Sequence, residues 1–121
     1  MCIRDRPGAQ AHERITSLGD GAAIKIMDSS TVCDYRMVNF MKVTANKHGI
    51  KWQPEVLTGG GTATAGIQRR GSNGSIAGRI SIPCRNVHQS IEMSDKRDIR
   101  NGIDLLKKCL QEIVQYDWSF K

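Results

Sequence analysis

The feature that most constrains the fold is a short segment, residues 22–27, whose apolar side chains occupy both sets of alternating positions. A strand that is apolar on both faces is typical of a sheet buried on both sides, as in α/β proteins. Residues 34–48 carry apolar side chains at three-to-four spacing and are followed by Gly49, which predicts an amphipathic helix with a left-handed stop. Residues 50–57 favour a second strand, and Pro54 within it predicts a place at a sheet edge or bulge.

The remaining segments continue this alternation. The three consecutive glycines at residues 59–61 rule out a regular strand over residues 58–66, and residues 76–83 favour a third strand ended by Pro83. Residues 94–115 predict a strongly amphipathic helix that Ser94 or Asp95 could cap. The stripe that we expect to face the core comprises Ile99, Ile103, Leu106, Leu110 and Ile113. About three strands and two main helices in this order predict an α/β fold, too small to close a layer by itself.

Two local expectations follow from polar and small residues. The run from Asp28 to Thr31 lies just before the first helix, where its side chains could satisfy free backbone N–H groups. Gly102, within the terminal helix, should let a neighbouring element approach closely.

Length, charge and cysteine usage restrict the class of protein. The 121 residues suffice for one domain, and no apolar run approaches the ~20 residues of a membrane span, so we expect no membrane partner. The net charge of +6 comes from scattered basic residues with little aromatic interleaving, so nucleic-acid binding is not the favoured hypothesis. Cys33, Cys84 and Cys109 match no metal-ligand spacing, which indicates reduced thiols and a cytoplasmic location.

Two loops follow predicted strands, where ligands collect in open α/β sheets. The first is the glycine run, which lacks the spacing of a P-loop or dinucleotide fingerprint and whose composition alone favours a tight turn. The second contains His88, which could be a metal ligand or a structural histidine, since a zinc site needs three or four ligands. Glu92, four residues on, could hold the imidazole or cap the next helix. His48 ends the first helix, where it complements the helix dipole.

Taken in order, these motifs resemble the C-terminal part of the tetrahedral, or glutamyl/leucyl-type, dinuclear metallo-aminopeptidases. The likeness extends from about residue 21 to residue 113. It comprises Asp28-Ser29-Ser30 after a strand, Gly60-Gly61-Thr62 in the glycine loop, a strand ended by Pro83, Arg85 with His88, and Glu92-Met93.

The resemblance implies a fold, an activity and a set of site residues. The fold would be the C-terminal part of a three-layer α/β/α zinc-peptidase-like catalytic domain. The activity would be removal of N-terminal residues from peptides by two divalent metal ions, zinc or cobalt, that activate a bridging water. His88 matches the family's last metal ligand; the other ligands and the general base would lie upstream. Supporting or substrate-loop residues would be Gly60, Gly61, Thr62, Arg85 and Glu92. The family also implies peptide substrates and dimer-based homo-oligomers of up to a dodecamer.

One position departs from the family pattern. Ala63 stands where the family's glycine loop usually has an aspartate. Because we take that aspartate to be supporting rather than metal-binding, the metal site stays plausible, whereas substrate preference and loop rigidity are put in doubt.

Both ends of the chain lie outside the region that resembles the family. Residues 1–6 resemble the translation of a sequencing-adapter DNA sequence, so we expect them to be an artefact. A polar leading segment follows at residues 7–20. Residues 21–115 would be the peptidase part, and residues 116–121 an aromatic tail that packs on a neighbour or frays.

Three hypotheses therefore stand. The first is a fragment of a metallo-aminopeptidase that is inactive alone, because one histidine cannot hold two metal ions. The others are a non-catalytic structural subunit and a small basic module that binds RNA.

Overall fold

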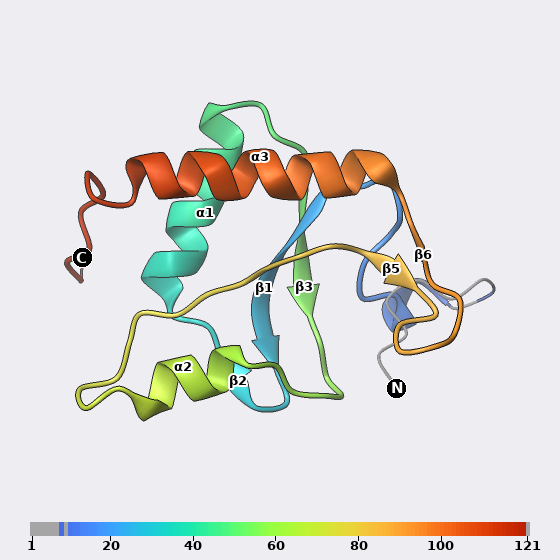
Figure 1. Ribbon diagram of the computed structural model, residues 1–121, viewed down its shortest axis with the longest axis horizontal. Coiled ribbons are helices and arrows are strands. Elements are labelled where there is room, and N and C mark those ends of the chain that lie inside the picture. The colour runs from blue at the N-terminus through green and yellow to red at the C-terminus, as the bar shows by residue number, and fades with distance from the viewer. Residues whose placement is uncertain (1–7, 9, 121) are drawn as a thin grey trace.

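The computed structural model describes residue 8 and residues 10–120, and the predicted adapter segment at residues 1–6 lies outside them (Figure 1). The fold is mixed α/β, as predicted. In chain order its elements are η1 (Ala11–Glu13), β1 (Ala22–Asp28), β2 (Thr31–Val32), α1 (Tyr35–Lys47), β3 (Trp52–Val56), α2 (Thr64–Arg70), β4 (Ile80–Ser81), β5 (Cys84–Arg85), β6 (Met93–Ser94) and α3 (Lys96–Glu112). Among these helices, none is long and apolar enough to cross a membrane.

Strand β1 lies at the centre of the sheet. It pairs in parallel with β3 and antiparallel with both β2 and β4, while β5 and β6 form a separate ribbon. In the described part of the chain β3 is an edge strand, and Pro54 within it lies opposite Ile24. The register shifts between Lys25 and Met27. The predicted edge position of Pro54 is therefore confirmed, since a residue without an N–H is tolerated at an edge.

The two main helices share one face of the sheet. Alternation along β1 directs Ala22 and Ile24 to the same side, where they meet the buried side chains of both helices. From the helices these are Val38, Phe40, Met41 and Ala45 of α1 and Leu105 and Cys109 of α3. The described residues thus supply one helical layer and the sheet of the predicted three-layer arrangement.

Helix α1 begins and ends where the sequence predicts. The Asp34 carboxylate accepts a hydrogen bond from the Arg36 N–H at 2.9 Å, and Gly49 after the last turn has a φ of 62°. The expectation that residues 28–31 cap this helix was wrong. They form the turn between β1 and β2, because residues 31 and 32 pair back onto β1 before the helix starts.

The predicted third strand is shorter than expected. Only Ile80–Ser81 of residues 76–83 pair with β1. Just before them the chain passes so close to α1 that a Cβ on Gly78 would lie 2.4 Å from the Met37 side chain. Contact with the helix therefore replaces sheet pairing over this stretch.

Helix α3 presents a different face to the sheet from the predicted one. Its buried residues are Asp98, Gly102, Leu105 and Cys109. Most of the predicted core stripe is exposed: Ile99, Ile103, Leu106 and Leu110 expose between 40% and 65% of their surface. The close approach at Gly102 is confirmed, since a Cβ there would lie 2.5 Å from Ile82 Cδ1. That approach, together with the buried Asp98, fixes the rotation of the helix and leaves the apolar stripe outside.

Because a contiguous apolar stripe in water favours association, we expect this chain to self-associate through α3. The double variant Ile103→Lys/Leu106→Lys should shift it toward monomer in light scattering after size exclusion, with the circular dichroism spectrum unchanged. Gln111→Lys, which adds charge on another exposed part of α3, is the control and should leave the association intact. Equal association of all three proteins would contradict the prediction.

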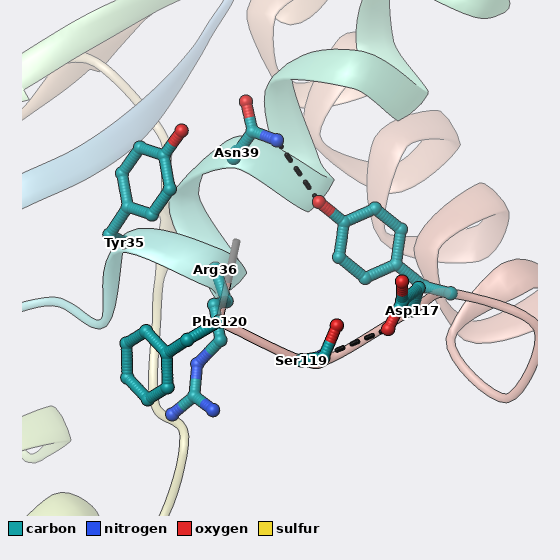
Figure 2. A pocket seen from close by; sticks show the side chains of 7 residues that line it. Tyr35, Arg36, Asn39, Asp117, Ser119 and Phe120 are labelled. Carbon is teal, nitrogen blue, oxygen red and sulfur yellow. Dashed lines mark hydrogen bonds between the residues drawn. The ribbon is translucent and has the colours of Figure 1, made fainter.

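The aromatic tail packs against helix α1. Tyr116 and Trp118 pack against Phe40 of α1, with ring centroids 4.9 and 5.3 Å away. The Arg36 guanidinium lies 4.0 Å from the centre of the Phe120 ring, and the Asn39 amide donates to the Tyr116 hydroxyl (Figure 2). A cavity of about 290 Å³ separates this tail from the first turn of α1. The tail is thus part of the fold.

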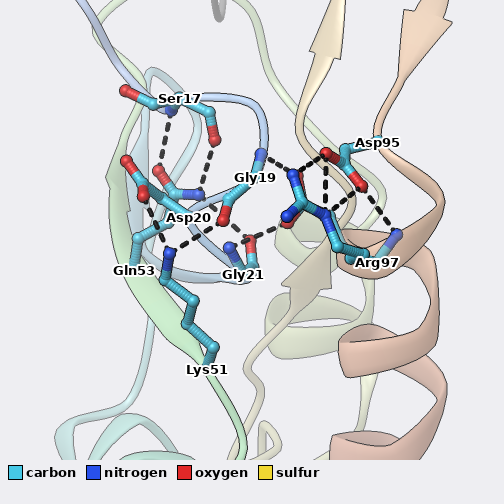
Figure 3. Close-up of polar contacts among 9 residues, drawn as sticks. Ser17, Gly19, Asp20, Gly21, Lys51, Gln53, Asp95 and Arg97 are labelled. Carbon is cyan, nitrogen blue, oxygen red and sulfur yellow. Dashed lines mark hydrogen bonds and ion pairs between the residues drawn. The ribbon is translucent and has the colours of Figure 1, made fainter.

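The leading segment is held against β3 and the start of α3. The Gln53 amide donates to the backbone oxygens of Ser17 and Gly21, at 2.9 and 3.0 Å (Figure 3). The Lys51 ammonium lies 3.0 Å from Asp20 Oδ1. These interactions hold the leading segment in place, although its composition predicts only that it is polar.

The three cysteines in the described residues form no disulfide with one another. Cys33 and Cys109 are buried, and burial raises the pKa of the Cys109 thiol to about 11. Such thiols are poor nucleophiles at neutral pH.

Candidate functional site

The glycine loop is anchored at the carboxyl end of β1, where β2 and α2 also gather (Figure 1). The Thr62 hydroxyl donates to Asp28 Oδ2 at 2.6 Å, and the Ser29 N–H donates to the Gly60 carbonyl at 3.3 Å. A Cβ on Gly61 would lie 2.2 Å from Ser30 Oγ. The glycines therefore allow this loop to lie directly on the Asp28–Ser30 turn.

The contact at Gly61 gives a matched pair of variants. Gly61→Ala should lower the free energy of unfolding by about 1–3 kcal/mol, because the new methyl group collides with Ser30. Gly59→Ala is the control, since a Cβ there meets nothing within 4 Å. Urea denaturation measures both. Adding Ser30→Ala to Gly61→Ala should restore much of the loss, and a Gly61→Ala protein as stable as the control would refute the contact.

A cavity of about 540 Å³ brings the glycine loop and the histidine loop together. Two predicted site residues from the first loop, Gly61 and Thr62, line it along with His88 from the second. The other predicted residues, Gly60, Arg85 and Glu92, do not line it. Its remaining walls are formed by Leu57, Ala63, Arg79, Ile80, Ser81, Ile82, Cys84 and Val87.

The histidine loop joins β5 to β6 with two residues in the left-handed region. Asn86 has a φ of 58° and His88 a φ of 65°. The His88 backbone N–H donates to Glu92 Oε1 at 2.7 Å, which holds the loop in this shape. Glu92 therefore neither binds the imidazole nor caps α3, the two roles that its spacing suggested; the cap is Asp95. Backbone strain of this kind clusters at functional sites, and the exposed His88 side chain is available to a ligand.

A metal centre needs more donors than this cavity has. Among the described residues, no group of three or more His, Cys, Asp and Glu side chains could hold a metal ion. His88 is a single donor, whereas a zinc site takes three or four protein ligands. The described part of the chain thus does not fit two metal ions by itself.

Beneath the glycine loop lies a buried ionic cluster that sequence reasoning missed. The Lys25 ammonium is 3.6 Å from Asp28 Oδ2 and 3.4 Å from Glu55 Oε1, and all three side chains are fully buried. Burial alone would raise the pKa of Asp28, but the bonds from Thr62 and Ser30 and the charge of Lys25 outweigh it and lower that pKa. The available signal was a charged residue inside each of two neighbouring strands, Lys25 and Glu55, which pair directly.

The position that departs from the family pattern lies at the start of α2. Ala63 precedes the helix and supplies no side-chain hydrogen bond to its free N–H groups. An aspartate is among the strongest capping residues, so its absence leaves the end of the glycine loop without a cap. Ala63 also lines the cavity, where it adds no charge.

The described elements form a mixed α/β fold with a cavity that borders Leu57, just after the carboxyl end of β3, and the glycine loop. The chain belongs to the M42 glutamyl aminopeptidase family, whose sequence profile matches residues 1–105. It is 32% identical over 101 residues to a protein of Acetivibrio thermocellus, and this covers 84% of the chain and 30% of that relative. It is 28% identical over 105 residues to the lysyl aminopeptidase of Pyrococcus furiosus, covering 87% and 30% of the two chains.

Solved structures agree with this assignment. Aminopeptidase APDkam598 from the archaeon Desulfurococcus kamchatkensis superposes with a TM-score of 0.86 at 35% identity, covering 91% of this chain and 31% of that one. The TET1 peptidase of Pyrococcus horikoshii, which can assemble into a tetrahedron or a large octahedral shell, superposes at 0.69 with 27% identity, covering 77% and 27%. The chain spans about 30% of the length of the relatives that it matches.

Proposed function

We propose that this chain forms the C-terminal part of a metal-dependent aminopeptidase that hydrolyses N-terminal residues from peptides. The observation that carries the proposal is the cavity where the glycine loop and His88 meet, at the carboxyl end of the parallel strands. Membership of the M42 glutamyl aminopeptidase family supports it. So does the short span of the match, because most of a relative's length has no counterpart here.

In this proposal each residue of the cavity has a limited role. His88 would be one ligand of a centre with two divalent metal ions, zinc or cobalt, and the remaining ligands and the general base would come from residues outside this chain. Such ions act as Lewis acids on the scissile carbonyl. Gly60, Gly61 and Thr62 would shape the cavity wall, while Glu92 and Arg85 would support the His88 loop from the β5–β6 ribbon. The chain alone should be inactive.

The proposal is tested in the protein encoded by the complete reading frame. His88→Ala should lower kcat/KM for a panel of aminoacyl p-nitroanilides by at least about 100-fold and reduce the bound metal, because a lost ligand is not replaced by water without cost. Its circular dichroism spectrum should match that of the unaltered protein. His12→Ala, at an exposed position of η1, is the control and should retain activity. A fully metallated and active His88→Ala enzyme would refute the assignment.

We also propose a cytoplasmic homo-oligomer built from dimers, of up to a dodecamer, acting on peptides. Support for assembly comes from the Pyrococcus horikoshii relative, which can assemble into a tetrahedron or a large octahedral shell. The exposed apolar stripe of α3 is consistent with further packing.

A further inference from the structure

The thiol of Cys84 belongs to the same cavity wall as His88 and has no part in the proposed metal chemistry. Cys84 is half-buried, whereas Cys33 and Cys109 are buried, so a reagent in water meets Cys84 first. Burial also raises the pKa of both buried thiols, and the thiolate is the nucleophilic form of cysteine. Among the described cysteines, Cys84 is therefore the candidate for chemical modification.

The surroundings of the Cys84 sulfur suit a nucleophile. As a thiol it donates to the Ile82 carbonyl at 3.4 Å, and its Sγ lies 2.9 Å from Ser94 Oγ, opposite it in the β5–β6 ribbon. The Ser94 hydroxyl can donate to the sulfur once the proton has left. Arg79 lines the same cavity and brings a positive charge to it. Reactive cysteines lie in partly exposed, electropositive places of this kind.

A second feature of the cavity points to a ligand independently of the thiol. Ser81, in the same walls, is only 3% exposed, and its hydroxyl has no hydrogen-bond partner among the residues that the structure describes. Buried hydroxyls are seldom left unsatisfied, so this orphan indicates a ligand atom. A hydroxyl and a guanidinium are both donors, and together they suit an anionic group.

We propose that Cys84 is a redox modification site, at which a small anionic disulfide forms a mixed disulfide and fills the cavity. The Cys84 proton passes to water, and the thiolate attacks one sulfur of the disulfide. A bond forms between Sγ and that sulfur, the old sulfur–sulfur bond breaks, and the other half leaves as a thiolate that takes up a proton. Cys84 is thereby oxidised and the departing half is reduced, so an excess of thiol reverses the exchange.

The bound half of the reagent would be held by its charge. Its anionic group would accept hydrogen bonds from Arg79 and Ser81, which line the cavity together with Cys84. Because His88 lines that cavity too, the bound group would exclude a peptide from it. This consequence rests on the proposed function, and it predicts a complete enzyme that oxidation inactivates reversibly.

Labelling of this 121-residue chain tests the site without metal or hydrolysis. The chain carries Cys2→Ser, because Cys2 lies outside the described residues. The probes are dithiodipropionate and cystamine, two small disulfides with carboxylate and ammonium ends respectively. Mass spectrometry follows labelling, and each rate is divided by that of the same chain unfolded in urea. The anionic probe should label Cys84 at least about tenfold faster than the cationic one, because positive charge steers anions.

Matched variants assign the preference to the cavity rather than to the net charge of the chain. Arg79→Met should abolish the preference for the anionic probe, and Arg79→Lys should retain part of it. Ser81→Ala should slow the anionic probe severalfold and leave the cationic one unchanged. Arg100→Met removes the same charge from the exposed surface of α3, and this control should change nothing.

Three results of the labelling would overturn the inference. They are equal normalised rates for the two probes, a preference that survives Arg79→Met in a folded protein, and labelling of Cys33 or Cys109 as fast as that of Cys84. The circular dichroism spectrum of each variant shows whether it is folded.

The complete protein tests the consequence for activity and separates it from the proposed function. Dithiodipropionate should lower kcat/KM by at least about tenfold, and a phosphine reductant should restore it, because the modified cysteine is a reversible disulfide. Cys84→Ser, compared with its own untreated sample, should lose nothing on treatment. Fully labelled enzyme that keeps its activity would overturn the blocking role of Cys84. A complete protein that hydrolyses no peptide would refute the proposed function, while selective labelling of Cys84 would still establish the modification site.

Discussion

Replacing Lys25 by methionine is expected to lower the free energy of unfolding by about 3–5 kcal/mol. Lys25 is the cation between two fully buried carboxylates, Asp28 and Glu55. Methionine fills the volume but removes the charge, so both carboxylates stay buried without it. Breaking a buried ion pair from one side is strongly destabilising for this reason. Urea denaturation measures the loss.

A surface ion pair in the same chain provides the matched control. The Lys51 ammonium pairs with the Asp20 carboxylate at 3.0 Å, but both side chains are more than half exposed. Lys51→Met should therefore cost less than about 1 kcal/mol. Removing all three charges together, as Lys25→Met/Asp28→Asn/Glu55→Gln, should restore part of the stability that Lys25→Met loses. Equal small losses for Lys25→Met and Lys51→Met would show that the cluster is not buried as described.

Replacing Asp98 by alanine should cost about 3 kcal/mol. The Asp98 carboxylate is fully buried in the first turn of α3 and accepts the backbone N–H groups of Gly19 and Gly21, at 2.7 and 2.8 Å. Alanine would leave these N–H groups without an acceptor in a buried place, at about 1–3 kcal/mol for each. It would also release the leading segment from α3.

Asp104→Ala serves as the control, because Asp104 lies on the same helix at a partly exposed position and makes no ion pair with the described residues. It should change the free energy of unfolding by less than about 0.5 kcal/mol. Hydrogen exchange at Gly19 and Gly21 should accelerate in Asp98→Ala alone. Identical urea midpoints for the two variants would contradict the prediction.

Local sequence patterns predicted where the helices lie along the chain better than they predicted which face of each helix is buried. Helix α1 could be placed from Gly49 and the apolar spacing, since a helix and its ends are encoded nearby in the sequence. The orientation of α3 could not be predicted from the sequence, because its apolar stripe does not reveal which neighbouring element covers it. Asp98 turns inward only because Gly19 and Gly21, far away in the sequence, present their N–H groups to it.

The candidate site shows the same difference between features that are encoded locally in the sequence and features that depend on distant residues. The glycine loop and His88 were predicted from motifs that follow strands, and they do meet at one cavity. Arg79, Ser81 and the Lys25 cluster were not predicted, because their proximity depends on how β4 and β3 pair with β1. The role of Glu92 in holding the His88 backbone required the loop's left-handed geometry, which no spacing rule contains.

We have proposed that this chain is the C-terminal part of a metallo-aminopeptidase and carries one of its metal ligands. The most direct test is to amplify the source DNA upstream of Pro7 and read it by a method that uses no transposase. We predict an open frame that encodes a histidine, a bridging aspartate, a pair of glutamates and an aspartate just before Pro7. A stop codon followed by a genuine start at Met1 would contradict it, because His88 would then have no partners with which to bind metal.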